Sequence, residues 1–186
     1  MHTEALAGVQ RMAEQSGLLH YGGIPANGMV EVPILDALDL GGADVNGTAR
    51  HLVDAVRRCH WTAADIEPGL GVDWVMDATQ PVEPKDQSAW DVVLCTEVLE
   101  HVRDWSLVLL AIASLLKPGG YAFITCASTG RRPHGARGEL NPASSEYYEN
   151  IRPFEFSAVL ESLFERSSAV YNPNPGDLYA WARKGS

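Results

Sequence analysis

The chain alternates short apolar runs with segments of helical pattern, and this alternation limits the folds it can adopt more than any other feature. The runs have the apolar or β-branched character of buried strands and lie at residues 37–40, 61–65, 73–76, 91–95 and 121–126. The longest helical pattern, at 107–116, separates the last two. Strands that alternate with helices are joined by right-handed crossovers into a parallel sheet. The sequence therefore predicts an α/β fold.

The expected elements continue at both ends of the chain. We expect a short helix near residues 3–16, followed by a loop at 20–28. Apolar residues recur at helical spacing from 154 to 164. Two strand-like runs, at 169–171 and 178–181, then flank a turn-rich stretch and predict an antiparallel hairpin.

A long polar segment precedes this C-terminal part. Residues 130–150, called the lid below, contain three glycines and two prolines and have no clear period. A long connection without secondary structure in a compact domain is typical of a functional loop. We therefore expect the lid to serve a site.

Charge and composition exclude several classes of protein. The net charge of −10, with only three lysines, provides no broad field for a phosphate backbone, so nucleic-acid binding is not expected. No apolar run approaches the ~20 residues needed to cross a bilayer, and the N-terminus lacks a secretory signal pattern. The three cysteines lie in or beside apolar runs and are expected to be reduced. These features predict a cytoplasmic protein that does not bind membranes.

Acidic residues mark the ends of three expected strands. Asp39 precedes Gly41 and Gly42, Asp65 ends the second strand, and Asp77 follows the third. Open α/β sheets bind ligands at the carboxyl ends of their strands, where the strand order reverses. Asp65 can accept hydrogen bonds from both ribose hydroxyls of a nucleoside, and Asp77 can accept one from the exocyclic amine of adenine. The strand ends therefore predict an adenosine site.

The loop after the first strand indicates what the adenosine carries. A dinucleotide site needs the pattern G-x-G-x-x-G, which lets the backbone approach a pyrophosphate, and residues 41–47 (GGADVNG) do not match it. Asp44 would also place a negative charge beside the phosphates. The same charge suits a sulfonium cofactor, which carries an ammonium group and a cationic sulfur. The loop therefore favours S-adenosylmethionine over a nicotinamide dinucleotide.

Four stretches of the chain resemble one family in their order and spacing. The stretches are ALDLGG (37–42), ADIEPG (64–69), DVVLCTEVLEHV (91–102) and LKPGG (116–120). Together they resemble the class I S-adenosylmethionine-dependent methyltransferases of the type 11 group, over roughly residues 35–126. The resemblance implies a Rossmann-like, doubly wound, seven-stranded and mostly parallel sheet, with helices on both faces and a C-terminal antiparallel hairpin.

The resemblance also implies where the cofactor binds. Asp39 and Gly41 would hold its methionine end, Asp65 its ribose, and Asp77 with the backbone of Ala78 its adenine. The predicted cofactor-binding residues are Asp39, Gly41, Gly42, Ala43, Asn46, Asp65, Ile66, Asp77, Ala78, Cys95, Thr96 and Glu97. Ala43 and Val45 stand where the family usually has glycines. The loop resembles a variant found in some members, so cofactor binding is expected to be retained.

A second group of residues follows the fourth expected strand. Glu97, Glu100 and His101 stand at helical positions i, i+3 and i+4, which would place them on one face. This arrangement resembles that of magnesium-dependent O-methyltransferases of the ubiquinone pathway and of small-RNA ends, where a further histidine, here His134, can complete the site. The same residues also occur in members without a metal, with Glu97 facing the cofactor and His101 orienting the helix. The metal-free form is favoured, and the metal ligands are left unassigned.

Methyl transfer to a hydroxyl or an amine needs alignment and a proton acceptor. An imidazole of near-neutral pKa suits this role. His134, in the lid, is the first predicted catalytic residue and His101 the second, and the alternative for His134 is a solvated loop histidine.

Other lid residues could contact the acceptor. The arginines Arg131, Arg132 and Arg137 could bind a carboxylate or phosphate, or could simply be solvated. Tyr147 and Tyr148 could wall an apolar pocket, whereas the helical spacing around Phe154 predicts that it lies in the core.

We therefore expect one methyltransferase domain over residues 1–186. It comprises an N-terminal helix and loop (1–34), a cofactor-binding core (35–129), the lid over the acceptor site (130–150) and a C-terminal helix and hairpin (151–186). The expected activity is methyl transfer from S-adenosyl-L-methionine to a small-molecule acceptor, as in O-methylation, with S-adenosyl-L-homocysteine as product. The alternatives are a magnesium-dependent O-methyltransferase that uses Glu97, Glu100 and His101, a non-catalytic protein that binds the cofactor, and a nicotinamide oxidoreductase.

Overall fold

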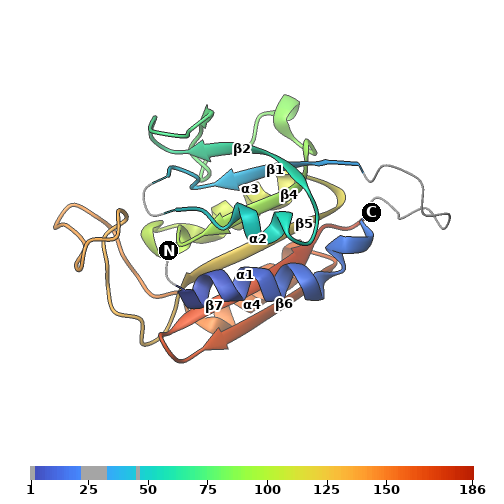
Figure 1. Ribbon diagram of the computed structural model, residues 1–186. Coiled ribbons are helices and arrows are strands. Elements are labelled where there is room, and N and C mark those ends of the chain that lie inside the picture. The colour runs from blue at the N-terminus through green and yellow to red at the C-terminus, as the bar shows by residue number, and fades with distance from the viewer. Residues whose placement is uncertain (1–2, 22–32, 45–46) are drawn as a thin grey trace.

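A seven-stranded sheet forms the centre of the molecule (Figure 1). The computed structural model describes residues 3–21, 33–44 and 47–186. The sheet has the strand order β3-β2-β1-β4-β5-β7-β6. Its strands are β1 (Leu35–Leu40), β2 (Cys59–Asp65), β3 (Trp74–Val75), β4 (Trp90–Thr96), β5 (Leu116–Ala127), β6 (Arg166–Asn172) and β7 (Asp177–Arg183). The predicted α/β class and the predicted seven-stranded sheet are confirmed.

The pairing of the strands agrees with the expected topology. β1 pairs in parallel with β2 and with β4, β2 with β3, and β4 with β5. β7 is antiparallel to both β5 and β6, which confirms the C-terminal hairpin. From β1 the chain proceeds to β2 on one side and only later reaches β4 on the other. The strand order therefore reverses between β1 and β4, where an open sheet of this class binds its ligand.

Helices cover both faces of the sheet because strand side chains alternate between the faces. One core includes Ala37, Val92 and Phe123, and α1 (Thr3–Ser16) and α2 (Arg50–Asp54) pack on this face. The other core includes neighbouring strand residues such as Leu38 and Val93. It is covered by α3 (Trp105–Leu115) and α4 (Pro153–Leu163). Figure 1 shows α1 and α2 in front of the sheet.

Short 3-10 turns complete the described elements, and they are η1 (Leu18–His20), η2 (Pro84–Asp86) and η3 (Leu99–His101). The lid forms no helix and no strand over residues 130–150. Part of the loop expected at 20–28, from residue 22 onward, lies outside the described residues. None of the helices in the described ranges has the length and apolar character needed to cross a bilayer.

Two local expectations are wrong. Phe154 was expected in the core but is 85% exposed, whereas Phe156 is fully buried. Because Pro153 is the first residue of α4, Phe156 and Leu160 form the i, i+4 pair that faces the core, and Phe154 points to solvent. The stretch 117–120 was expected to separate a helix from a strand, but it lies within β5, where the pairing shifts between Trp90 and Val92.

The three cysteines are free, which agrees with the expected reduced state. Cys95 and Cys126 are fully buried, and burial raises the pKa of both thiols. Burial, followed by the charge of Asp54, raises the pKa of the half-buried Cys59 thiol to about 12. Since the thiolate is the reactive form, all three thiols should be inert in the folded protein.

We predict that an aromatic disulfide reagent such as 5,5′-dithiobis(2-nitrobenzoate) reacts slowly with the native protein at pH 8, because no thiol ionises there. The folded Cys59 should react faster only as the pH rises toward about 12. In denaturant at pH 8 all three cysteines should react quickly. Rapid labelling of one cysteine in the native protein at pH 8 would contradict this account of the core.

The contact of α1 with β7 gives a second prediction. A Cβ atom at Gly8 would collide with the ring of Tyr179, which is buried and held by its hydroxyl on Asp177. Gly8→Val should therefore lower the free energy of unfolding by about 1–3 kcal/mol, the usual cost of overpacking. Gly69→Ala is the control, because its Cβ would meet only Val72 at an ordinary distance of 3.8 Å. Urea unfolding measures both variants, and an unchanged midpoint for Gly8→Val would refute the close packing.

Candidate functional site

A pocket lies where the strand order reverses. It has a volume of about 120 Å³ and is lined by the ends of β1, β2 and β4 and by one lid residue. The lining residues are Asp39, Gly41, Gly42, Ala43, Gly47, Thr48, Asp65, Thr96, Glu97 and Ala136. The fold therefore brings together seven of the predicted cofactor residues.

The loop after β1 needs its glycines. Gly41 has φ 78°, and a Cβ there would collide with Val98. A Cβ at Gly42 would lie 2.6 Å from the carbonyl oxygen of Asp39. Both glycine N–H groups donate to the carbonyl of Ala64, at 2.8 and 3.0 Å. Both positions therefore require glycine, and both residues line the pocket.

Asp39 is buried behind this loop and already has partners. Its carboxylate accepts hydrogen bonds from Arg50 Nε at 2.7 Å and from Thr48 Oγ1 at 3.0 Å. Burial raises the pKa of Asp39, and Arg50 and Thr48 oppose that rise. Arg50 also donates to the carbonyl of Gly42 at 3.3 Å. Asp39 therefore fixes the shape of the loop.

Sequence reasoning missed Thr48 and Arg50. A signal for Arg50 does exist, because a cation in the first turn of a helix is disfavoured by the helix dipole, and Arg50 begins α2. An arginine at such a position needs a local carboxylate partner, and Asp39 is that partner.

Asp65 and Asp77 differ in position. Asp65 lines the pocket, and its Oδ2 accepts from the N–H of Ala43 at 3.2 Å. Asp77 does not line it, and its Oδ1 accepts from the N–H of Thr79 at 2.9 Å and from the hydroxyl of Thr79 at 2.6 Å. These hydrogen bonds lower the pKa of Asp77. The adenine role of Asp77 stays a prediction.

The remaining predicted cofactor residues have varied surroundings. Ile66 is 65% exposed beside Asp65, and Ala78 is partly buried against the core. Cys95 is fully buried and does not line the pocket. Asn46 lies outside the described residues.

The expectation that Glu97, Glu100 and His101 share one face of a helix is wrong. Glu97 does not share a helix with Glu100 and His101, because η3 spans only Leu99–His101 and Glu97 has a left-handed φ of 57°. Its Oε1 accepts from the hydroxyl of Thr125 at 2.9 Å, and its N–H donates to the Thr125 carbonyl. These two bonds to β5 hold Glu97 at the pocket wall. A strained non-glycine backbone is a frequent feature of functional sites.

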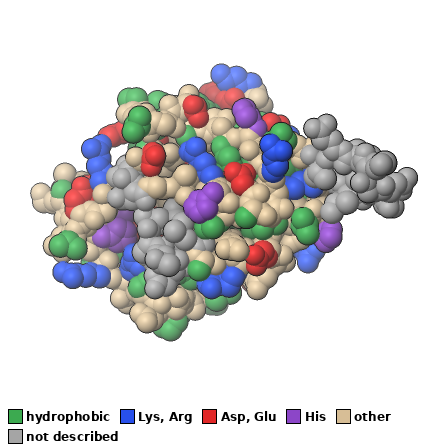
Figure 2. Space-filling model, viewed as in Figure 1, with side chains coloured by type: hydrophobic (Ala, Val, Ile, Leu, Met, Phe, Trp, Pro, Cys, Tyr) green, Lys and Arg blue, Asp and Glu red, His purple; other side chains and the backbone are tan. Residues whose placement is uncertain are grey.

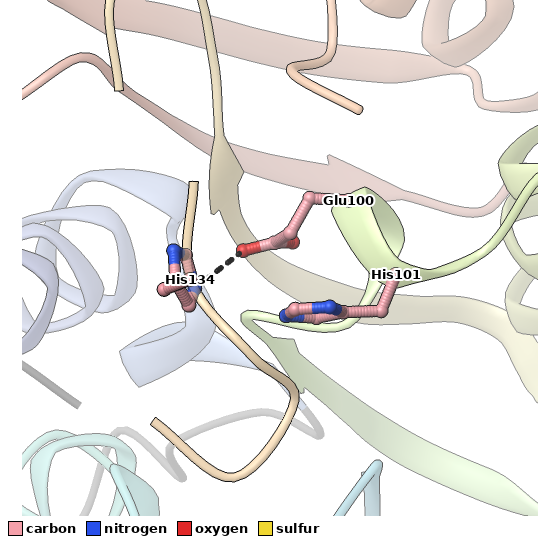
Figure 3. A group of neighbouring side chains, drawn as sticks. All are labelled: Glu100, His101 and His134. Atoms are coloured by element: carbon pink, nitrogen blue, oxygen red, sulfur yellow. Dashed lines mark ion pairs between the residues drawn. The ribbon is translucent and has the colours of Figure 1, made fainter. Parts of the chain in front are cut away.

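Glu100, His101 and His134 form a cluster beside Glu97 (Figure 3). Their ligand atoms all lie within 4.8 Å of one another, and His134 Nε2 is 3.8 Å from Glu100 Oε1. Glu100 is fully buried, with Oε1 accepting from the N–H of Ala127 at 3.2 Å. Glu100 Oε2 and His101 Nδ1 are buried and have no hydrogen-bond partner. The three side chains therefore bring one carboxylate and two imidazoles together at one point.

Burial controls protonation in this cluster. It raises the pKa of Glu100, and the neighbouring charge of Glu97 raises it further. Burial also lowers the pKa of His101, with His134 as the second cause. His101 is thus kept neutral, a state in which a ring nitrogen can accept a proton or bind a metal.

The other lid candidates have separate positions. Tyr148 packs edge-on against His134 and His101, with ring centroids 5.1 and 5.5 Å apart. Tyr147 instead lies under the guanidinium of Arg103, 4.6 Å away. Tyr148, and not Tyr147, therefore joins the cluster.

The three lid arginines do not form one anion site. Arg131 pairs with the buried Asp177 at 3.1 Å, and Arg137 pairs with Glu67 at 3.5 Å on the surface. Arg132 is exposed. The arginines therefore do not gather around a single acceptor group.

Several relatives and solved structures are similar to this chain. A ubiquinone biosynthesis O-methyltransferase of Marinobacter nauticus is 33% identical over 122 residues, which are 58% of this chain and 51% of that protein. One of Ralstonia nicotianae is 30% identical over 155 residues, covering 76% and 63%. The chain thus spans about half to two thirds of the length of these curated relatives.

Solved structures agree in fold. The 1,6-didemethyltoxoflavin-N1-methyltransferase of Burkholderia thailandensis, solved with 1,6-didemethyltoxoflavin and S-adenosylhomocysteine, has a TM-score of 0.61 at 17% identity and covers 98% of this chain and 79% of that one. A DhpI–SAH complex has a TM-score of 0.58 at 20% identity and covers 98% and 96%. A family model described as a methyltransferase domain matches residues 3–167. Because this model matches most of the chain, the chain belongs to the methyltransferase-domain family. Its fold is that of the class I enzymes.

Proposed function

We propose that the protein transfers a methyl group from S-adenosylmethionine to a hydroxyl of a small molecule. The observation that carries this proposal is the pocket at the strand-order reversal, which Asp65 lines together with Gly41 and Gly42. Its acidic lining suits a cofactor with cationic groups and disfavours a pyrophosphate. The relatives named as O-methyltransferases support the reaction class.

Residues that line the pocket or follow the neighbouring strands would each hold one part of the cofactor. Asp65 accepts hydrogen bonds from the ribose hydroxyls, while the exposed Ile66 covers the adenine, whose amine binds the remaining acceptor capacity of Asp77. The loop of Gly41 and Gly42, shaped by Asp39 and Arg50, holds the methionine end. At about 120 Å³ the pocket is smaller than the ~300 Å³ of a typical ligand site, so the whole cofactor would fit only if Ala136 and the lid were displaced.

The acceptor would bind next to the pocket on its Glu97 side, toward His134 and Tyr148. The sulfonium of the cofactor activates its methyl carbon, so the protein mainly aligns the acceptor and removes its proton. His134 is the proposed base, because its Nε2 faces the cluster and its Nδ1 lies 3.3 Å from the carbonyl of Arg132. That carbonyl can hold the tautomer in which Nε2 accepts. The ring of His101 lies beside that of His134, with the two ring centroids 5.3 Å apart.

The charge of the surface fits a small acceptor. Basic and acidic side chains are interspersed on the visible face (Figure 2), and the net charge is −10. Such a surface attracts no polyanion. This charge is consistent with a small-molecule acceptor.

We predict that the protein binds S-adenosylhomocysteine in calorimetry and that Asp65→Ala weakens binding about 10- to 100-fold, the cost of losing hydrogen bonds to a charged group. Asp36→Ala is the matched control, because Asp36 lies at the opposite end of β1 and its side chain is 57% exposed. No binding by the wild type, or equal losses in both variants, would refute the cofactor site.

The reaction class is tested with labelled S-adenosylmethionine and a panel of small phenols, carboxylates and amines. The proposal expects label on a phenol oxygen and loss of most turnover in His134→Ala, with cofactor binding retained. Label only on amines, or only on a protein or RNA substrate, would overturn it. Tight cofactor binding without any turnover would favour the non-catalytic alternative.

A second candidate function, the metal-dependent form of the same reaction, rests on the cluster of Glu100, His101 and His134. Each of the three side chains offers one ligand atom, and these atoms all lie within 4.8 Å of one another, which is close enough to hold one cation. Glu97 is not part of the cluster, so the donor set is one carboxylate and two imidazoles. Magnesium prefers oxygen ligands, whereas imidazoles suit manganese, iron, cobalt or zinc. A bound cation would polarise the acceptor hydroxyl.

The metal-dependent form predicts that Mn²⁺ binds to chelator-treated protein more tightly than Mg²⁺, as measured by calorimetry and by loss of the free Mn²⁺ electron paramagnetic resonance signal. Glu100→Gln and His101→Ala should each abolish binding, while Glu97→Gln should retain it. Activity that is indifferent to chelator, together with no Mn²⁺ binding, would remove this candidate and leave the metal-free reaction.

A further inference from the structure

The carboxylate of Asp177 has no role in the proposed function, although it is fully buried at the start of β7. Arg131 Nη1 lies 3.1 Å from its Oδ1, and the hydroxyl of Tyr179 donates to its Oδ2 at 3.0 Å. Burying an ion pair rarely adds stability, because removing two charges from water costs as much as their attraction returns. In other proteins, replacing a buried ion pair by apolar residues of similar volume is often neutral for stability. The pair therefore calls for an explanation other than stability.

Arg131 is the point at which the two ends of the lid meet. Its N–H donates to the carbonyl of Ser128 at 2.9 Å, near the start of the lid. Its carbonyl accepts from Asn150 Nδ2 at 2.9 Å, at the end of the lid. A third bond joins the flanking chain, from Ser128 Oγ to the carbonyl of Ile151 at 2.6 Å. A contact that holds Arg131 in place therefore also holds the two ends of the lid together, which are called the base of the lid below.

The hairpin turn before Asp177 packs directly against this base. A Cβ at Gly176, which has φ 104°, would lie 2.5 Å from the nitrogen of Arg131. The carbonyl of Gly176 accepts from the N–H of Ser128 at 2.7 Å, and the hydroxyl of Tyr171 donates to the carbonyl of Thr129 at 2.6 Å. The β6–β7 hairpin thus supports the start of the lid through its backbone and through Asp177.

The cluster of Glu100, His101 and His134 lies beside this support. His134 follows Arg131 by three residues and reaches the cluster from the lid (Figure 3). The charges of Arg131 and Asp177 both act on Tyr148, whose pKa is raised mainly by burial. Because His134 is only three residues from Arg131, the position of His134 depends on how Arg131 is held.

We propose that Asp177 is a positioning residue, which holds Arg131 so that the lid presents His134 to Glu100 and His101. This inference rests on the proposed function for its purpose, because the imidazole it positions is the proposed base. Its geometry can be tested without turnover. Asp177 does not touch the cofactor pocket, so cofactor binding should not depend on it.

The test uses the full chain, treated with chelator, and two variants. Asp177→Asn keeps the shape and removes the charge, and the double variant Arg131→Met with Asp177→Leu replaces the pair by apolar side chains. Glu165→Gln is the matched control, because it breaks the ion pair of Glu165 with Arg183 (2.9 Å) at the other end of the same hairpin. The readout is the nuclear Overhauser effect between the rings of His101 and His134, whose centroids are 5.3 Å apart.

The proposal predicts that this ring-to-ring signal is lost in both Asp177 variants and kept in Glu165→Gln, while the far-ultraviolet circular dichroism and the binding of S-adenosylhomocysteine stay as in the wild type. A folded variant that keeps the signal would overturn it, as would a failure of both variants to fold, which would make the pair a stability element. Failure of the wild type to bind the cofactor would instead refute the proposed function. The ring-to-ring signal would still show whether Asp177 positions His134.

Discussion

The reversal of strand order between β1 and β4 is the constraint on which the rest of the structure depends. Because successive connections run outward from this point, the loops after β1 and β4 separate and leave a pocket that the sheet cannot fill. The side chains that line this pocket come from the ends of the strands. Asp65 at the end of β2 therefore lies close to the glycine loop after β1. Arg50 then joins the buried Asp39 to the carbonyl of Gly42 and so ties this loop to the end of β1.

Glu97 connects the cofactor pocket with the buried cluster. Its left-handed backbone and its two bonds to Thr125 turn the chain sharply at the end of β4, so its side chain lines the pocket while Glu100 points into the protein. The negative charges of both carboxylates are close enough for Glu97 to raise the pKa of Glu100. The protein thus keeps a strained backbone and an unsatisfied carboxylate in one place, which stability alone would not select.

The strands, the hairpin and the acidic strand ends could be predicted because each depends on a local pattern. Apolar runs such as 91–95 and the carboxylates of Asp39 and Asp65 carry their own signal. The position of Glu97 could not be predicted, since helical spacing favours an α-helix and only the tertiary bonds to Thr125 impose the left-handed turn. Asp177 could not be predicted because its partner Arg131 lies 46 residues away along the chain, whereas the position of Arg50 at the start of a helix is a local signal for a carboxylate partner. Phe154 shows that a helix start decides which of two aromatic residues is buried.

A crystal structure of the protein with S-adenosylhomocysteine would test the central claim most directly. The account predicts electron density for the ribose within hydrogen-bonding distance of Asp65, the amino-acid end against the loop of Gly41 and Gly42, and the sulfur facing Glu97 and His134. Density for the ligand at any other edge of the sheet, or a ribose that makes no contact with Asp65, would contradict it.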